Sequence, residues 1–232
     1  MKLPSQPEFS RRQLLRTGLT ATAAAFLTGG FDLAFPSPAQ SQSKLTPDAA
    51  LTELMEGNKR FTSGRMTAYE QDLAILKQHT EQKQEPFAAV LSCADSRVPV
   101  ELVFDQTIGH IFVTRVAGNV ITPEIIGSLE YGAAVLGTKV ILVMGHSNCG
   151  AVKATMQGKE VPGQISSLFP HIQPGVDQGG GDLAAATKAN AMVQARLLRE
   201  SSTVIAGMVK TGGVKVTSGY YDVGTGTVTL LE

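Results

Sequence analysis

The sequence lacks an excess of charge of either sign, because 20 Lys and Arg residues are balanced by 20 Asp and Glu residues. This balance argues against the basic footprint of a nucleic-acid-binding surface and against an acidic tail that recruits partners by bulk charge. Internal repeats and low-complexity tracts are also absent from the sequence. The 232 residues, 43% hydrophobic and 17% charged, are typical of one ordinary globular domain.

The amino-terminal segment lacks an apolar run suited to crossing a membrane, which needs roughly 20 strongly apolar residues. Its candidate, LTATAAAFLTGGFDLAF, is Ala-rich and contains two glycines and Asp32. The run follows SRRQLLRTG (10–18) and precedes SPA, a pattern typical of a twin-arginine export signal cleaved after Ala39. We therefore predict an export signal over 1–39, a linker over 40–46 and a destination in the periplasm or a thylakoid lumen.

Cysteine is scarce, since Cys93 and Cys149 are the only two in the chain. In an exported protein, two cysteines suggest a disulfide first. Metal binding is the competing interpretation, because twin-arginine cargo generally crosses the membrane already folded and can be loaded with a metal beforehand. Export therefore leaves both interpretations open.

From residue 87 onward, short apolar runs alternate with segments of helical periodicity. Continuous Val, Ile and Leu runs separated by helices are typical of a parallel sheet covered on both faces. The sequence thus predicts an α/β fold: a mainly parallel β-sheet of about four strands, with room for an extra edge strand, flanked by helices. The expected strands are 87–93, 111–118, 139–146, 213–222 and 226–232, and the expected helices are 122–137, 149–158 and 181–201.

An amino-terminal helical arm is expected ahead of the sheet. Thr46 and Pro47 form a capping pair before Leu51 and Phe61, which recur at helical spacing. A second helix is expected over 69–82. We expect both helices to lead into the core without forming it.

Three residues with metal-binding side chains lie at the ends of two expected strands. Cys93 ends the first strand, and the third strand ends in HSNC, which supplies His146 and Cys149. Each residue alone is readily explained as a buried thiol or a core histidine. Because the carboxyl ends of parallel strands meet at one edge of the sheet, the three are expected to converge. Two thiolates and one imidazole with a fourth position open are typical of catalytic zinc.

Asp95 and Arg97 follow Cys93 at alternate positions. A carboxylate this close to a metal-binding thiolate can reach either the metal or its bound water. The planar guanidinium of Arg97 can hold the carboxylate by paired hydrogen bonds and keep it ionised, so that Asp95 accepts a proton. A surface ion pair of little energetic value is the simpler alternative.

The motifs CADSRVP and GHSNCGAV resemble the signature of the β-class carbonic anhydrases, C-x-D-S-R followed by H-x-x-C-G, and the likeness covers residues 47–232. The resemblance implies one Zn²⁺ per subunit, held by Cys93, His146 and Cys149. Asp95 and Arg97 would be the catalytic dyad, with Asp95 a fourth zinc ligand in a closed state of the site.

The implied reaction is the reversible hydration of carbon dioxide to bicarbonate and a proton, with zinc-bound hydroxide as the nucleophile. The family also implies a four-stranded, mainly parallel sheet and a homodimer or higher homo-oligomer. The amino-terminal arm would embrace a second subunit, and the active site would lie at the interface.

Three further positions can be compared with the family. Gln84, nine residues before Cys93, matches a glutamine that contacts substrate in some members. The tryptophan of a non-catalytic bicarbonate site is missing, because Val90 stands at its position and the chain has no tryptophan. Arg115 matches another part of that site, but without its partners it is read as an interface or core-edge charge.

Two alternative functions stay open on the sequence alone. The same fold and ligand set can support hydrolysis of carbon disulfide or carbonyl sulfide, since access to the pocket would select the substrate. A non-catalytic zinc or redox-sensing module could instead use the two cysteines as a thiol–disulfide switch.

Overall fold

The computed structural model describes residues 43–68 and 84–231. The export signal predicted over 1–39 and the second helix predicted over 69–82 lie outside these residues. Within the described part of the chain, no helix is both long and apolar enough to cross a membrane.

A single five-stranded sheet forms the centre of the fold, in the order β2-β1-β3-β4-β5. The first four strands are parallel, and the short β5 pairs with β4 in the antiparallel sense. The prediction of a mainly parallel sheet with an extra edge strand is therefore confirmed. The strands are β1 (Ala88–Ser92), β2 (Ile111–Arg115), β3 (Val140–His146), β4 (Lys215–Tyr221) and β5 (Val228–Leu230).

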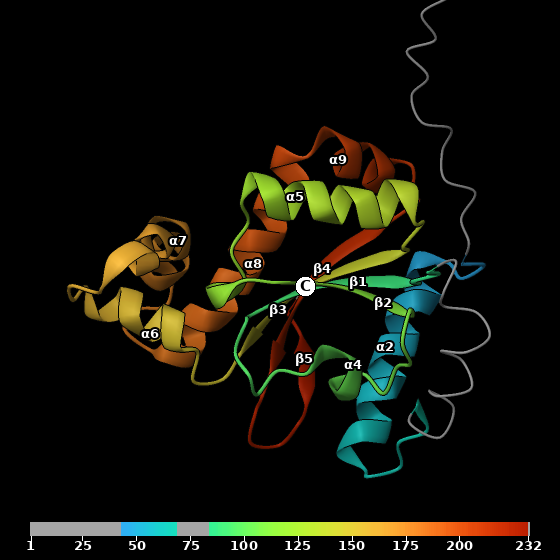
Figure 1. Cartoon of the computed structure of the whole chain (residues 1–232), viewed down its shortest axis with the longest axis horizontal. Helices are drawn as coiled ribbons and strands as arrows, with labels where there is room; N and C mark the ends of the chain where they lie inside the picture. The colour runs from blue at the N-terminus through green and yellow to red at the C-terminus, as the bar shows by residue number, and fades with distance from the viewer. Residues whose placement is uncertain (1–42, 69–83, 232) are drawn as a thin grey trace, which may run out of the picture. The chain divides into compact units, whose positions relative to one another are not determined.

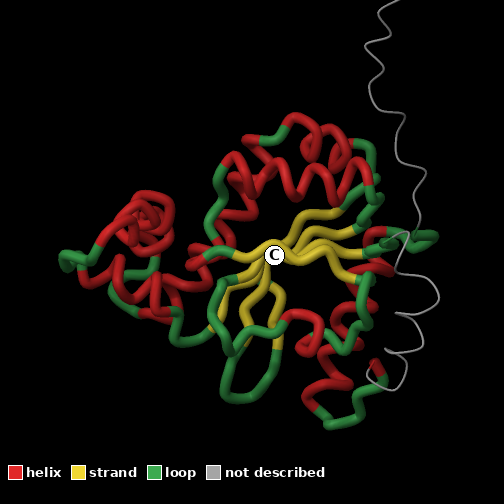
Figure 2. Tube along the Cα trace, viewed as in Figure 1, coloured by secondary structure: helices red, strands yellow, loops and turns green. Residues whose placement is uncertain are grey.

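Helices cover both faces of the sheet (Figures 1 and 2). Alternate side chains of a strand point to opposite faces of the sheet and so reach opposite layers. Ala88 and Val90 of β1 belong to one buried cluster, with α2 (Pro47–Thr62) and α4 (Val100–Val103). Ala89 and Leu91 face the other cluster, which includes residues of α5, α8 and α9. These helices span Pro123–Glu130, Leu183–Ser201 and Thr203–Lys210, and a π-helical turn, Tyr131–Val135, extends α5.

A third buried cluster lies where the strands β1 and β3 end. It joins Cys93 and Cys149 to apolar side chains of α6 (Gly150–Gln157) and α7 (Phe169–Gln178), among them Val152 and Ile172. The carboxyl ends of the two central strands are therefore covered by helices and loops, which places the cysteines in an enclosed setting.

Helix α2 is part of the core, contrary to the expectation that it only leads into it. Thr46 caps the helix as predicted, its hydroxyl accepting the N–H of Ala49 at 3.2 Å. Ala50 and Leu54 are fully buried against the sheet. The spacing of apolar residues predicted the helix correctly, but it could not show which surface the helix would cover.

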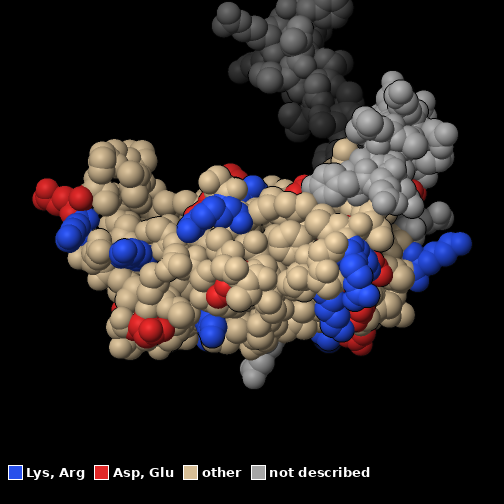
Figure 3. Space-filling model, turned by 90° about the horizontal axis from the view of Figure 1, so that it is seen from below, with Lys and Arg blue, Asp and Glu red and all other residues tan. Residues whose placement is uncertain are grey.

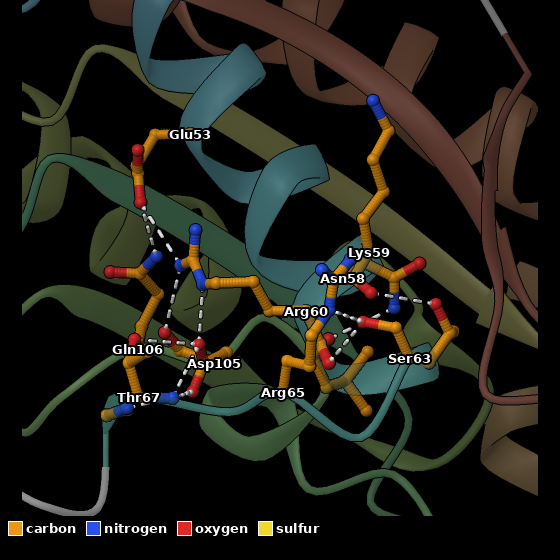
Figure 4. Close-up of polar contacts among 12 residues, drawn as sticks. Glu53, Asn58, Lys59, Arg60, Ser63, Arg65, Thr67, Asp105 and Gln106 are labelled. Atoms are coloured by element: carbon orange, nitrogen blue, oxygen red, sulfur yellow. Dashed lines mark hydrogen bonds and ion pairs between the residues drawn. The ribbon is translucent and has the colours of Figure 1, made fainter.

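A buried polar network fastens α2 to the loop after α4 (Figure 4). The Asp105 carboxylate is fully buried and accepts hydrogen bonds from Arg60 Nε at 2.6 Å and from the backbone N–H groups of Thr67 and Ala68. Asn58 also donates to the carbonyls of Val103, at the end of α4, and Gly226, and it accepts the N–H of Val228 in β5. Because each buried polar group has a partner, the network stabilises the packing of α2 instead of penalising it.

Besides the short α4, two helices, α7 and α9, were not expected from the sequence. Pro174 lies inside α7 and disfavours a helix locally, whereas Pro170 in the first turn is compatible with one. The segment forming α9, TVIAGMVK, is rich in β-branched residues and resembles a strand. Both helices form because each buries an isoleucine, Ile172 or Ile205, in the core.

The face shown in Figure 3 carries Lys and Arg as well as Asp and Glu, scattered over a largely uncharged surface. This mixed pattern agrees with the balanced composition of the sequence. Bulk electrostatic attraction is thus a poor basis for partner choice on this face.

Candidate metal centre

The candidate site lies at the carboxyl ends of β1 and β3, where the strand order reverses. From β1 the chain continues to β2 on one side, and from β3 it continues to β4 on the other. Cys93 follows the last residue of β1, His146 is the last residue of β3, and Cys149 directly precedes α6. Ligand sites of open α/β sheets form at such a switch point.

The structure brings the three predicted ligands together. One ligand atom from each of Cys93, His146 and Cys149 lies within 4.8 Å of the other two, and all three residues are buried. Both cysteines are free thiols. Side chains that lie far apart in the sequence thus form one compact cluster of two sulfur atoms and one imidazole nitrogen.

The orientation of His146 is fixed by its neighbour. Its Nδ1 lies 3.0 Å from the backbone carbonyl of Ser147, and because a carbonyl only accepts, Nδ1 carries the proton. The other ring nitrogen, Nε2, is buried without a hydrogen-bond partner among the described residues. An unpartnered buried nitrogen is costly, and its place in one cluster with two thiols suits a bound metal ion.

The two thiols have opposite protonation preferences. A hydrogen bond from Cys149 is the largest cause that lowers the pKa of Cys93 to about 4, and the N–H of Gly118 adds to it. The neighbouring Cys93 thiolate and burial raise the pKa of Cys149. Without a metal, the pair therefore shares one proton, which a metal ion would displace.

The donor set fits zinc. Two thiolates and one neutral imidazole are soft and borderline ligands, and three protein ligands leave one coordination position for water or substrate. Cys93, His146 and Cys149 would therefore hold a catalytic rather than a structural ion.

Asp95 and Arg97 form a close, oriented pair beside the cluster. Arg97 donates from Nε to Oδ1 at 2.9 Å, from Nη2 to Oδ2 at 2.8 Å and from its backbone N–H to Oδ1 at 2.9 Å. The side-chain hydrogen bonds from Arg97 are the main cause that lowers the pKa of Asp95 well below its usual range. Asp95 Oδ2 lies 3.9 Å from His146 Nε2, so the ionised carboxylate borders the metal position.

Arg115 is a site residue that sequence reasoning missed. From the end of β2, its Nε donates to the carbonyl of Cys93 at 3.0 Å and its Nη2 to the carbonyl of Asp95 at 2.5 Å. Arg115 thus clamps the loop that carries both residues, and it is not merely an edge charge. The parallel pairing that sets Arg115 opposite Ser92 was the signal that could have revealed this role.

The turn Ala117–Asn119 also reaches the cluster. The backbone N–H of Gly118 donates to Cys93 Sγ at 3.3 Å. Gly118 has a φ of 74° and is buried, and a Cβ there would lie 2.6 Å from Ile172 Cδ1. Glycine is therefore required both for the left-handed backbone and for the close approach.

Gln84 is not brought to the cluster within this chain. It is exposed and lies ahead of the amino end of β1, whereas Cys93 follows the carboxyl end of the same strand. The role of Gln84 in substrate contact stays a prediction.

Sequence comparison identifies the family. The family model described as carbonic anhydrase matches residues 88–228. A carbonic anhydrase of Mycolicibacterium smegmatis is 40% identical over 134 residues, which cover 56% of this chain and 65% of that relative. Carbonic anhydrase 2 of Mycobacterium tuberculosis is 39% identical over 140 residues, covering 59% and 67%. The chain thus spans about two thirds of the length of these curated relatives.

Solved structures agree on the fold. The Coccomyxa β-carbonic anhydrase, solved in complex with acetazolamide, has a TM-score of 0.60 at 26% identity, covering 78% of this chain and 86% of that chain. A tetrameric β-carbonic anhydrase from Sordaria macrospora has a TM-score of 0.64 at 18% identity, covering 78% and 96%. The matched sequence, the sheet and the cluster of two cysteines and one histidine lead to one conclusion: the chain belongs to the carbonic anhydrase family, in its β class.

Proposed function

We propose that the protein catalyses the reversible hydration of carbon dioxide, with one Zn²⁺ per subunit held by Cys93, His146 and Cys149. The observation that carries this proposal is the buried, unpartnered Nε2 of His146, a residue that forms one ligand cluster with two thiols. The membership of the chain in the carbonic anhydrase family supports the same reaction.

Zinc at this position would lower the pKa of a coordinated water and so supply a nucleophile near neutral pH. Asp95 would accept the hydrogen bond from that water and orient it. Both carboxylate oxygens of Asp95 are already bonded to Arg97, which keeps Asp95 ionised and holds it back from direct ligation. The position of Arg97 would therefore determine whether Asp95 accepts a hydrogen bond from water or binds the metal as a fourth ligand.

The surroundings of the cluster suit a small apolar substrate. Val120, Val152 and Ile172 pack around the two cysteines and are fully buried. Apolar walls exclude bulk water from the reacting carbon and strengthen the electrostatic interactions inside the site.

We further propose that the protein works as a homo-oligomer, as its tetrameric structural neighbour from Sordaria macrospora does. Gln84 lies at the opposite end of β1 from the cluster of its own chain. It could contact substrate only in the site of another subunit. The substrate role of Gln84 thus depends on assembly.

The sequence SRRQLLRTG further supports a proposal that the protein is exported, to the periplasm or a thylakoid lumen, by a twin-arginine signal cleaved after Ala39. Replacing Arg11 and Arg12 together by lysine should retain the uncleaved precursor inside the cell. Processing and export of that variant at the normal rate would contradict the proposal.

The reaction is tested by measuring zinc content and the initial rate of carbon dioxide hydration by stopped flow on the same preparation. Carbonyl sulfide and carbon disulfide serve as competing substrates. We expect about one zinc per subunit and hydration faster than hydrolysis of either sulfur compound. A zinc-replete protein that hydrolyses a sulfur analogue but does not hydrate carbon dioxide would overturn the assignment.

A further inference from the structure

Two successive residues of the turn over the metal centre adopt a left-handed backbone. Gly118 has φ and ψ of 74° and 12°, and Asn119 has a φ of 45°. A left-handed residue other than glycine costs free energy and persists only where its surroundings hold it in place. Because the N–H of Gly118 points at Cys93 Sγ, whatever holds this turn also holds a hydrogen bond to a metal ligand.

Two buried amide side chains of α8 hold the turn. Asn190 Nδ2 donates to the carbonyl of Gly118 at 2.8 Å. One helical turn later, Gln194 Oε1 accepts the backbone N–H of Ile121 at 2.8 Å. Both side chains are fully buried, and they bond to the backbone on either side of Asn119. The turn is therefore anchored at two points.

The orientation of both amides follows from the hydrogen bonds. The N–H of Ile121 only donates, so the group of Gln194 facing it must be the oxygen. Its Nε2 then donates to the carbonyl of His171 at 2.8 Å and to Asn190 Oδ1 at 3.1 Å. With its oxygen occupied, Asn190 must present Nδ2 to Gly118. Gln194 thus sets the direction of Asn190.

We propose that Asn190 and Gln194 are positioning residues of the metal centre, which hold the Gly118 N–H on the Cys93 sulfur without touching any ligand themselves. This inference rests on the proposed zinc function. An N–H donor on a thiolate withdraws charge from the sulfur and fixes its position, and outer hydrogen bonds of this kind tune metal affinity and Lewis acidity. A chain of hydrogen bonds thus connects Gln194 to Asn190, Asn190 to the backbone of Gly118, and Gly118 to the sulfur of Cys93.

Close packing transmits the constraint from the helix to the turn. A Cβ on Gly175 of α7 would lie 2.6 Å from Asn190 Cα, so α7 and α8 are in backbone contact where Asn190 stands. The carbonyl of His171, on the same helix α7, receives the Gln194 amide. Asn190 therefore has little room to adopt another rotamer when its hydrogen bond is lost.

The test replaces Asn190 by leucine, which is similar in size but has no donor. Two quantities are measured: zinc affinity, by competition with a chelator, and the thiolate-to-metal absorption band of the Co²⁺-substituted protein. We expect the Asn190→Leu variant to bind zinc roughly 10- to 100-fold more weakly and to shift the Co²⁺ band. The Gln194→Met variant should change both quantities in the same direction.

Asn58→Leu is the matched control. Asn58 is also a buried asparagine. Its replacement by leucine removes three hydrogen bonds, to Val103, Gly226 and Val228, none of which involves the turn. It should lower stability but leave zinc affinity and the Co²⁺ band unchanged. Equal zinc affinity and band position in folded Asn190→Leu and wild type would overturn the inference, as would an equal loss in Asn58→Leu.

The outcomes separate this inference from the proposed function. If Asn190→Leu does not fold, the Gln194→Met variant tests the positioning role instead. It keeps the volume of the side chain and retains Asn190. A wild-type protein that binds no zinc would overturn the proposed function itself. A wild type that binds zinc with both variants unchanged would overturn only the positioning role.

Discussion

Replacing Gly118 by alanine should disrupt the turn that carries the hydrogen bond to Cys93. The new methyl group would lie 2.6 Å from Ile172 Cδ1 and 3.2 Å from its Cγ1, at a φ of 74°. A left-handed alanine costs about 1–2 kcal/mol, and overpacking a buried site costs about 1–3 kcal/mol. We therefore expect a loss of about 2–5 kcal/mol in the free energy of unfolding.

The Gly64→Ala variant separates the cost of the left-handed backbone from the cost of overpacking. Gly64 has a φ of 68°, and a Cβ there would meet no atom within 4 Å. Only the strain of the left-handed backbone should therefore lower the free energy of unfolding of this variant. Ile172→Val, combined with Gly118→Ala, removes the Cδ1 atom that clashes and should recover part of the loss. Each free energy of unfolding is obtained from urea denaturation of the metal-free protein.

Zinc affinity provides the functional measure of the same variants. Gly118→Ala should weaken zinc binding because the N–H moves away from Cys93, whereas Gly64→Ala should leave it unchanged. A Gly118→Ala variant that is destabilised no more than Gly64→Ala, or that binds zinc as tightly as the wild type, would contradict the proposed role of Gly118.

Three further changes test other parts of the site and fold. Asp95→Asn should retain zinc but lower the rate of carbon dioxide hydration by about 10²- to 10⁴-fold, because the proton acceptor is lost; unchanged stopped-flow rates would contradict the role of Asp95. Arg97→Lys keeps the charge but loses the paired donors, so hydration should fall by roughly 10- to 100-fold with zinc content unchanged. Burial would raise the pKa of Asp105, but hydrogen bonds from Arg60, Ala68 and Thr67 outweigh it and lower that pKa. Asp105→Asn should therefore cost about 1–3 kcal/mol at neutral pH, and its difference from wild type should shrink as the pH falls below about 4; a difference independent of pH would contradict this.

The central sheet and the ligand cluster could be predicted because their signals are local. The two central strands, β1 and β3, are buried and mostly apolar runs, and the reactive side chains lie at or directly after their ends. Parallel pairing then forces Cys93 and His146 to the same edge. The position of Asp95 beside the cluster follows from its distance of two residues from Cys93.

The parts that could not be predicted depend on contacts across the fold. Arg115 bonds to the carbonyls of Cys93 and Asp95 only because β2 pairs with β1 in one register. The amides of Asn190 and Gln194 look like ordinary polar residues of a helix until α8 is packed against the turn. Helix α7, with an internal proline, forms because burial of Ile172 outweighs its local preference.

The central claim is that Cys93, His146 and Cys149 hold zinc, with Asp95 held beside it by Arg97. Anomalous X-ray scattering from a crystal, recorded above and below the zinc absorption edge, tests it most directly. We predict one zinc peak per subunit among the three ligand atoms, with the Asp95 carboxylate still bonded to Arg97. The absence of a peak in crystals of zinc-loaded protein, or a disulfide between Cys93 and Cys149 in its place, would contradict it.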